Sequence, residues 1–566
     1  MMRLSGNCCR ATTALLITLA LVSCGGGGGS DNSPTATTTP VVSIPKIAPD
    51  DAVRLAQQGT FGPTKALVDH IIALGSADAW ITEQFGLSDS GYADLATRTV
   101  STQYCNQMAS TAQAVCNRDY LSATPVAAAF YAHAAQNSDQ LRQRVAWALS
   151  QLIVTSDLEV RSTAGAAAFN QILLTNAFGN YRDILQAVTL NPYMGDYLDM
   201  ANSSKAAPNQ NYARELMQLF SMGVNALNMD GTVQKDSTGA AVPNYSEDEV
   251  RSVARALTGW TYARLNGAAI TDNQNLDYAN PMIVNQAVYD TTAKTFLGAN
   301  VAANATAQDS EKAVVDVVFN NASTAPYVSK FLIQHLVLSN PSPAYVSRVA
   351  TVFANNGAGV RGDMKAVIRA ILTDAEARGT TSAAASPGKV KEPVLLSLGI
   401  ARLIGDKTDG YAFLSRDAAM GQTPFHAPSV FNYYPPDYPL PLGNGLLSPP
   451  SKLITTGTVI ARHNLAYDWT VSGDSRTEYA AQSTVTGATG TQPDWSQWEA
   501  FGTGTDAMLD QINLLMLAGQ MTGAQRSALT ATMTAITNSD ATVQARKRAQ
   551  AALYIVGTSP AYQVER

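Results

Sequence analysis

Charge, histidine and cysteine are all scarce in this 566-residue chain, and the motifs of common enzymes are missing from it. Charged residues make up 14% of the sequence, the net charge is −6, and there are five histidines and five cysteines. No His-Glu-x-x-His or Cys-x-x-Cys spacing occurs, so neither a zinc site nor a covalent haem is expected. Gly-x-Ser-x-Gly elbows and Walker loops are also absent, and the sequence therefore predicts no metal and no cofactor. The acidic balance gives no basic footprint for nucleic acid.

Apolar runs long enough to cross a membrane are lacking too. Near the N-terminus, Arg3 and Arg10 precede an apolar run over residues 14–22, which is too short for a permanent span but is typical of a secretory signal. The next residues complete Leu-Val-Ser-Cys, which resembles the bacterial lipobox and implies cleavage before Cys24 and lipidation of its sulfur. An ordinary signal peptide with a stray cysteine is the alternative. We expect residues 1–23 to be a signal peptide.

A polar stretch rich in glycine, threonine and proline follows Cys24. Residues 24–46 cannot bury a core, so we interpret them as a lipidated, disordered tether for a body at residues 47–566. In bacterial lipoproteins an aspartate directly after the lipidated cysteine favours the inner membrane, and Gly25 stands here instead. That resemblance implies an outer-membrane lipoprotein that faces the periplasm or the cell surface.

Two cysteines, Cys105 and Cys116, remain in the body once the signal and the lipidated residue are set aside. An even pair in an oxidising compartment predicts a disulfide, with two unpaired buried thiols as the alternative. A loop this short stabilises the fold by about 2–3 kcal/mol in the entropic description of cross-links.

Helical periodicity prevails in the body. Apolar residues recur at spacings of three and four over residues 141–153 and 364–371, and residues 509–536 predict two helices joined near Thr522-Gly523. Alternating strand patterns are scarce. The fold class we predict is mainly α, a multi-helix body with a main part at 47–400 and a C-terminal part at 401–566.

Two segments of the body do not follow the helical pattern. Residues 227–245 contain the turn pairs Asp230-Gly231 and Thr238-Gly239, which predict a small β-hairpin or an ordered loop. Residues 425–450 are rich in proline and predict a long irregular loop that lies on the surface or is pinned by side chains. Asp230 and Asp236 supply oxygen ligands suited to calcium, but their spacing lacks the EF-hand pattern.

Charged residues concentrate on two predicted helices. On the first, residues 211–222, the side chains of Asn211, Arg214, Glu215 and Gln218 share one narrow wedge of the helical wheel, and Gly223 is expected to end the helix. Apolar residues fill its other side, namely Ala213, Leu216, Met217 and Phe220.

The second helix is predicted to start with a capping box. Ser246 and Glu249 have the required spacing, and Gly259 is expected to end the helix. Its apolar side carries Val250, Val253, Ala254 and Leu257, while Arg251 and Arg255 line one polar flank.

Two interpretations of these helices remain open. In one, Arg214, Arg251 and Arg255 hold an anionic group, Asn211 helps to bind it, and Glu215 acts as a catalytic base or metal ligand. In the other, a buried salt-bridge network fixes the packing of the helices, and loss of one partner costs about 3–5 kcal/mol. Both interpretations expect Glu215 to lie opposite Arg251 or Arg255.

A series of short words resembles the bacterial domain of unknown function 1800 family. The resemblance runs in order from about residue 51 to the end of the chain, and it is carried by residues 58–64 (QGTFGPT), 141–145 (LRQRV), 178–183 (FGNYRD), 211–216 (NYAREL), 245–251 (YSEDEVR), 254–260 (ARALTGW), 294–298 (KTFLG), 391–393 (KEP), 429–434 (SVFNYY) and 558–564 (TSPAYQV).

The resemblance implies an exported, mostly helical protein but names no activity. Members are often encoded beside proteins of the domain of unknown function 1501 family, which look like alkaline-phosphatase or sulfatase relatives, and this implies a possible envelope partner. Many relatives carry histidines where this chain has residues 146–151 (AWALSQ) and Tyr289-Asp290. If those histidines bind a metal in the relatives, the same role is not expected in this chain.

Further candidate ligand-binding residues lie in the proline-rich segment. His426 is the histidine most suited to a site, although a packed loop histidine is the more ordinary interpretation. Tyr433 belongs to the aromatic run 431–434, which suits stacking on sugar rings or on a partner, with packing into the body as the alternative.

Two functional hypotheses follow from the sequence. The first is an accessory or scaffold lipoprotein that acts with an envelope partner, and the lack of a known nucleophile or metal motif favours it. The second is a hydrolase-like enzyme or anionic-ligand binder centred on Glu215 and the three arginines.

Overall fold

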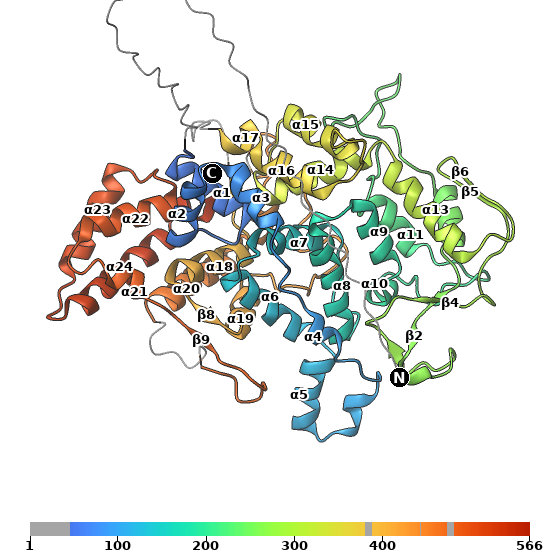
Figure 1. Ribbon diagram of the computed structural model, residues 1–566, viewed down its shortest axis with the longest axis horizontal. Helices are drawn as coiled ribbons and strands as arrows, with labels where there is room; N and C mark the ends of the chain where they lie inside the picture. Colours follow the sequence, from blue (N-terminus) through green and yellow to red (C-terminus); the bar gives the residue numbers. More distant parts are fainter. Residues whose placement is uncertain (1–45, 380–387, 442, 473–479, 566) are drawn as a thin grey trace, which may run out of the picture. The chain divides into compact units, whose positions relative to one another are not determined.

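Helices dominate the computed structural model, which describes residues 46–379, 388–441, 443–472 and 480–565 (Figure 1). The prediction of a mainly α body is confirmed. The predicted signal peptide, the lipidation site Cys24 and nearly all of the tether lie outside the described residues. In the described part, no helix combines the length and the apolar character needed to cross a bilayer.

Several helices of the N-terminal half begin at side-chain caps, with Thr64, Ser76 and Ser162 among them. In chain order they are α1 (Pro49–Gly59), α2 (Lys65–Leu74), α3 (Ala77–Phe85), α4 (Ala93–Ala96), η1 (Tyr104–Gln107), α5 (Ser110–Tyr120), α6 (Thr124–Gln136), α7 (Gln140–Leu152), α8 (Thr163–Thr175), η2 (Asn176–Phe178), α9 (Tyr181–Thr189), α10 (Pro192–Tyr197), α11 (Asn211–Gln218) and α12 (Glu247–Ala256).

The C-terminal half adds a second series of helices. They are α13 (Ala307–Asn320), α14 (Thr324–Leu336), α15 (Pro343–Ala354), α16 (Met364–Thr373), α17 (Ala375–Arg378), α18 (Pro393–Ile404), α19 (Tyr411–Ala419), η4 (Pro449–Leu453), α20 (Thr456–Thr470), α21 (Ser496–Glu499), α22 (Thr505–Leu517), α23 (Gly523–Ala535), α24 (Ala541–Gly557) and α25 (Pro560–Gln563), with η3 (Leu265–Gly267) before them. The predicted joint at Thr522-Gly523 is confirmed, because Thr522 caps α23. The division into parts at residues 400 and 401 stays a prediction, although α18 runs across it.

Strands are short and form two-stranded antiparallel pairs in the described residues. The pairs are β1 (Trp260–Thr261) with β4 (Ile283–Val284), β2 (Ala263–Arg264) with β3 (Leu276–Asp277), β5 (Lys294–Phe296) with β6 (Ala299–Val301), β7 (Lys389–Val390) with β10 (Val564–Glu565), and β8 (Lys407–Thr408) with β9 (Thr491–Gln492). The β7–β10 pair matters most for the fold, since it ties the C-terminal end of the chain to the start of α18.

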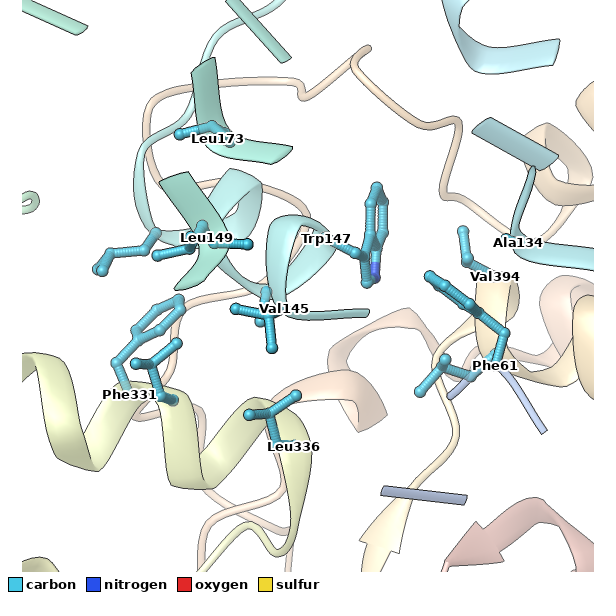
Figure 2. Packing of buried hydrophobic residues seen from close by; sticks show 14 of the residues in the cluster. Phe61, Ala134, Val145, Trp147, Leu149, Leu173, Phe331, Leu336 and Val394 are labelled. Carbon is cyan, nitrogen blue, oxygen red and sulfur yellow. The ribbon is translucent and has the colours of Figure 1, made fainter. Parts of the chain in front are cut away.

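Helix α7 forms the centre of the hydrophobic core, and helices from distant parts of the chain pack against it, among them α1, α3, α8 and α14. Figure 2 shows Val145, Trp147 and Leu149 of α7 between Leu336 of α14 and Val394 of α18. Trp147 is 2% exposed and stacks on Phe130 with ring centroids 4.9 Å apart. Burial of such large apolar side chains contributes about 1.5–3 kcal/mol each, so α7 anchors the body.

The proline-rich segment is irregular, as predicted, and side chains pin it to the body. Asn432 donates to Gln151 Oε1 at 2.6 Å, and Tyr434 donates to Glu392 Oε2 at 2.6 Å. Asn340 donates to the Leu447 carbonyl at 2.8 Å. The segment's described residues therefore have a fixed course, without helix or strand until η4 begins at Pro449.

The insert between α11 and α12 is an ordered loop with two tight turns. Gly231 and Gly239 take positive φ at these turns, as the predicted turn pairs require. Isolated bridges such as Leu227 with Val233 and Lys235 with Ala241 join its arms, so the hairpin character is limited to single bridges rather than strands.

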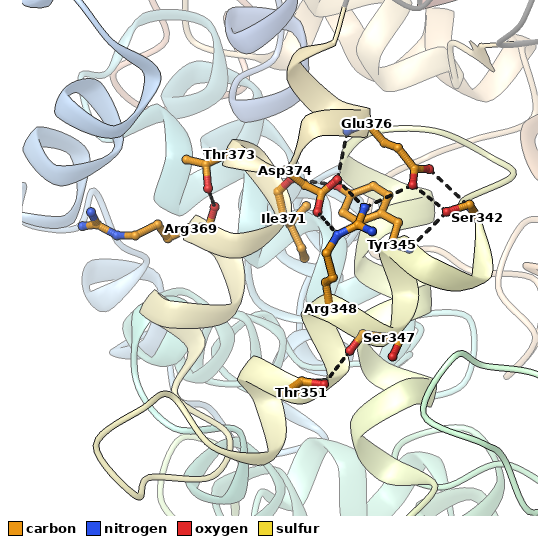
Figure 3. Close-up of polar contacts among 10 residues, drawn as sticks. All are labelled: Ser342, Tyr345, Ser347, Arg348, Thr351, Arg369, Ile371, Thr373, Asp374 and Glu376. Carbon is orange, nitrogen blue, oxygen red and sulfur yellow. Dashed lines mark hydrogen bonds and ion pairs between the residues drawn. The ribbon is translucent and has the colours of Figure 1, made fainter.

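A polar cluster closes the corner between α15 and α17 (Figure 3). Arg348 contacts Asp374 at 2.7 and 2.9 Å and Glu376 at 3.1 Å, and Ser342 donates to the same Glu376. Tyr345 donates to the Ile371 carbonyl at 2.6 Å beneath them. Arg348 is half-exposed, so we assign this cluster to helix packing and give it a modest share of stability.

One buried carboxyl makes the fold sensitive to pH. Burial raises the pKa of Glu311 on α13 to about 7, against the opposing effect of hydrogen bonds from Gln186 on α9. The pKa of Glu311 is higher in the folded protein than in the unfolded chain. Its contribution to the stability of the fold is therefore fully present below pH 4.5 and is lost as the pH rises through 7. The free energy of unfolding of Glu311→Gln should therefore exceed that of the wild type by up to about 3 kcal/mol at pH 8, but by only about 1 kcal/mol at pH 5.

Urea unfolding at both pH values measures this difference. The exposed Glu159→Gln variant serves as the control, and its curve should follow the wild type. An equal effect of Glu311→Gln at pH 5 and pH 8 would show that Glu311 does not titrate in this range.

Candidate functional site

Helices α11 and α12 pack against each other, as their apolar faces predict. Leu216, Met217 and Phe220 are fully buried, as are Val250 and Val253. The capping box of Ser246 and Glu249 is present, so the start of α12 is confirmed. The predicted end of the first helix is wrong, because α11 stops at Gln218 and turns lead to Gly223, whose φ is +75°.

The three arginines do not converge on Glu215. Arg214 makes a two-pronged contact with Glu247 at 2.7 and 2.8 Å, Arg251 pairs with Asp248, and Arg255 contacts Asp290 at 2.9 Å. The expected pairing of Glu215 with Arg251 or Arg255 is therefore wrong. Each arginine instead pairs with a carboxylate that lies nearby on α12 or in the loop that follows β4.

Glu215 lies on the buried side of α11, apart from the three arginine pairs. Its residue is 7% exposed, and its Oε2 atom has no hydrogen-bond partner among the described residues. Burial raises the pKa of Glu215, and the charge of Arg214 offsets only part of that effect. A buried carboxyl in this state suits proton transfer chemically, but the three arginines do not surround it as an anion site.

Asn211 is not part of a shared site with Glu215. It lies in the first turn of α11, where its side chain donates to Asp199 Oδ2 at 3.3 Å. Asp199 has a φ of +57°, a conformation that short polar side chains tolerate. The contact serves to hold the turn before α11.

His426 forms a pair with Asp157, apart from the residues of α11 and α12. The His426 Nδ1 atom contacts Asp157 Oδ1, while the backbone amide of Ala123 donates to Asp157 Oδ2 at 2.8 Å. The hydrogen bond from His426 to Asp157 raises the pKa of the imidazole. The preceding residue, Phe425, has a φ of +62°, which is rare for a bulky side chain and concentrates strain at this pair.

Tyr433 is packed into the body rather than presented to solvent. It is 5% exposed, and its hydroxyl donates to the Thr423 carbonyl and accepts from the backbone amide of His426. Its neighbour Phe431 is 54% exposed. The aromatic run is thus divided, with Phe431 as the side chain that is available for contact.

The predicted disulfide between Cys105 and Cys116 is confirmed, with Cα atoms 5.6 Å apart. The two aspartates considered for calcium cap the turns of the insert. Asp230 accepts from Thr232 and Asp236 accepts from Thr238. Within the described ranges, no cluster of three or more His, Cys, Asp or Glu side chains is placed to hold a metal ion.

A groove of about 470 Å³ lies between α14, the insert and the proline-rich segment. Its size falls in the range of small-molecule and peptide sites. The groove is lined by Gln218, Leu219, Gly223, Val224, Asn225, Leu227, Gly231, Val233, Tyr327, Lys330, Phe331, Gln334, Phe431, Pro435, Pro436, Asp437 and Leu447. Only Lys330 and Asp437 of these are charged, so the groove is chiefly apolar.

A recess of about 50 Å³ continues the groove inward. It shares Tyr327, Phe331 and Phe431 with the groove, and His335 and Tyr434 line its inner end. The same two residues line a further cavity of about 10 Å³ that reaches Glu392. Sequence reasoning missed His335, because a histidine within an apolar helix carries no local signal of a site.

Two of the words that carry the family resemblance meet beside this recess. Glu392 of the Lys-Glu-Pro word accepts from Trp147 Nε1 at 2.8 Å and from Tyr434 of the Phe-Asn-Tyr-Tyr word. Burial raises the pKa of Glu392, but the charge of Arg144 and these hydrogen bonds outweigh it, so the pKa lies below the ordinary value. Glu392 therefore stays ionised inside the core.

Comparison with known proteins supports the same family. The model of the family described as protein of unknown function (DUF1800) matches residues 54–564, nearly the whole chain. No curated protein and no solved structure matches the chain.

The state of Glu215 gives a direct test of the first site hypothesis. Because its buried Oε2 lacks a partner and its charged form is disfavoured, Glu215→Gln should raise the melting temperature at pH 7 by a few degrees at most. A calorimetric scan measures this. The control is Glu247→Gln, which removes an exposed partner of Arg214 and should change the melting temperature little. A marked fall for Glu215→Gln would instead reveal a stabilising charge contact.

Proposed function

The chain belongs to the DUF1800 family, and from that premise we propose that it is a lipid-anchored accessory protein of the cell envelope that docks an extended segment of a partner protein in the groove. The groove carries this proposal, since it is a chiefly apolar cavity of about 470 Å³. A partner related to alkaline phosphatases or sulfatases, as the resemblance implies, is compatible with it.

The chemistry of the groove favours a polypeptide as its occupant. Its rim exposes apolar side chains, with Phe431 at 54%, Val224 at 50% and Val233 at 40%. Exposed aromatic and aliphatic side chains around a cleft of this kind are typical of docking sites. Lys330 and Asp437 lie on its walls and are suited to opposite charges on the partner.

The local pairing of the arginines argues against the competing hypothesis. An anion-binding site needs cationic groups that are not already neutralised, and Arg214, Arg251 and Arg255 each contact a carboxylate. Removing an arginine from such a pair to bind a ligand would first break that contact. An enzymatic role through Glu215 and the arginines is therefore the weaker alternative.

Peptide display tests the groove with a defined probe. A phage-displayed library of random peptides, selected on the purified protein, should yield binders rich in aromatic and aliphatic residues. Val224→Asp should weaken these binders at least tenfold, because a carboxylate would enter the apolar rim. The matched control is Ile460→Asp on α20, which replaces an equally exposed apolar residue outside the groove and should bind normally.

The outcome of the selection decides the occupant. Binders that ignore Val224→Asp would refute docking in the groove. If no peptide is selected, but the protein binds specific oligosaccharides on a glycan array and Val224→Asp abolishes that binding, the occupant of the groove is a sugar and not a partner segment.

Membrane anchoring is tested separately at Cys24. The Cys24→Ser variant lacks the sulfur that would carry lipid, so it should move from the membrane fraction to the soluble periplasmic fraction. Immunoblots of the two fractions measure this. Retention of the variant in the membrane would contradict the proposed anchor.

A further inference from the structure

His335 is held rigidly at the inner end of the recess. It is 8% exposed, and its ring lies between Phe331, with centroids 4.1 Å apart, and Tyr434, at 6.3 Å. Both ring pairs are nearly parallel, at 16° and 15°. The stack fixes the plane of the imidazole, so its two nitrogens have defined surroundings.

The backbone decides which nitrogen of His335 carries the proton. Nδ1 lies 3.1 Å from the Phe331 carbonyl, which can only accept, so Nδ1 must be the donor. Burial lowers the pKa of His335 to about 4, and the ring is neutral at physiological pH. Nε2 therefore carries a lone pair, and no hydrogen bond to it is formed within the described part of the chain. Nε2 is not fully enclosed, and it can accept from a ligand or water that enters the recess lined by His335.

The recess has the size and walls for one aromatic ring. Its volume of about 50 Å³ holds roughly four water molecules, which is close to the size of a phenol group. Tyr327, Phe331 and Phe431 supply aromatic walls between the open groove and His335. A group that fits must be apolar along its body and carry a hydrogen-bond donor at its tip.

A ligand group that carries a charge at its end is disfavoured next to His335 Nε2. A carboxylate has no proton to donate to Nε2. An ammonium group would lose its hydration among the aromatic walls of the recess. A neutral hydroxyl meets neither penalty.

We propose, on the basis of the docking function proposed above, that the recess takes the side chain of a tyrosine from the partner segment, with its phenol O–H donating to His335 Nε2. The aromatic walls hold the ring, and the hydrogen bond selects tyrosine over phenylalanine. Loss of a buried hydrogen bond of this kind weakens binding about tenfold or more.

Titrations with the tightest displayed peptide test the assignment. Selected peptides should share a tyrosine, and replacing it with phenylalanine should weaken binding to the wild type at least tenfold. In His335→Phe the ring stack is kept but the acceptor is lost, so the tyrosine and phenylalanine peptides should bind within about threefold of each other. The matched control is His133→Phe on α6, a histidine outside the groove, which should keep the wild-type preference.

Each outcome separates this assignment from the docking function. If the phenylalanine peptide binds the wild type as tightly as the tyrosine peptide while Val224→Asp still abolishes binding, the tyrosine recess is refuted and docking stands. If no peptide binds, both are refuted. If His335→Phe fails to fold, two measurements on the wild type still decide: the affinities of the tyrosine and phenylalanine peptides, and the ¹⁵N chemical shift of His335 Nε2. A new hydrogen bond to Nε2 shifts that resonance when the tyrosine peptide binds. A resonance that does not shift refutes the contact.

Discussion

An ionised carboxylate in the core, Glu392, constrains the rest of the structure. An isolated charge in a protein interior is very costly, so it must be surrounded by donors and opposite charge. Trp147, Gln422 and Tyr434 donate to it, and Arg144 supplies the positive field. These groups come from α7, the segment after α19 and the proline-rich segment, so the chain must bring all three to the start of α18 before the charge can be accommodated.

That constraint also shapes the groove. The described residues of the proline-rich segment have no helix or strand before η4, and their course depends on contacts such as Tyr434 with Glu392 and Asn432 with Gln151. With Tyr433 and Tyr434 turned into the body, Phe431 is left exposed on the opposite side of the segment. The apolar rim of the proposed docking site is thus a consequence of how the buried charge is satisfied.

The helices α11 and α12 show how a charge-rich pattern can mislead. A helical wheel places Glu215 and the arginines on compatible flanks, but it does not include carboxylates that come from elsewhere. Asp290, which follows β4, reaches Arg255, and Glu247 at the start of α12 reaches Arg214. In these pairs the three arginine side chains stay 34%, 55% and 35% exposed, whereas pairing with the buried Glu215 would strip more water from the charge, and Glu215 Oε2 remains without a partner within the described residues.

The sequence by itself determined the mainly helical body, the capping box of Ser246 and Glu249, the turns of the insert, and the pair Cys105–Cys116, because each depends on local periodicity, local hydrogen bonds or a simple count of cysteines. Only the tertiary structure decided the partners of the arginines, the groove, and the approach of His335 to Tyr434. Apart from the Arg251–Asp248 pair, which spans three positions, those contacts join residues tens to hundreds of positions apart. Their formation depends on how apolar surfaces pack and where a buried charge finds donors, and no local pattern encodes either.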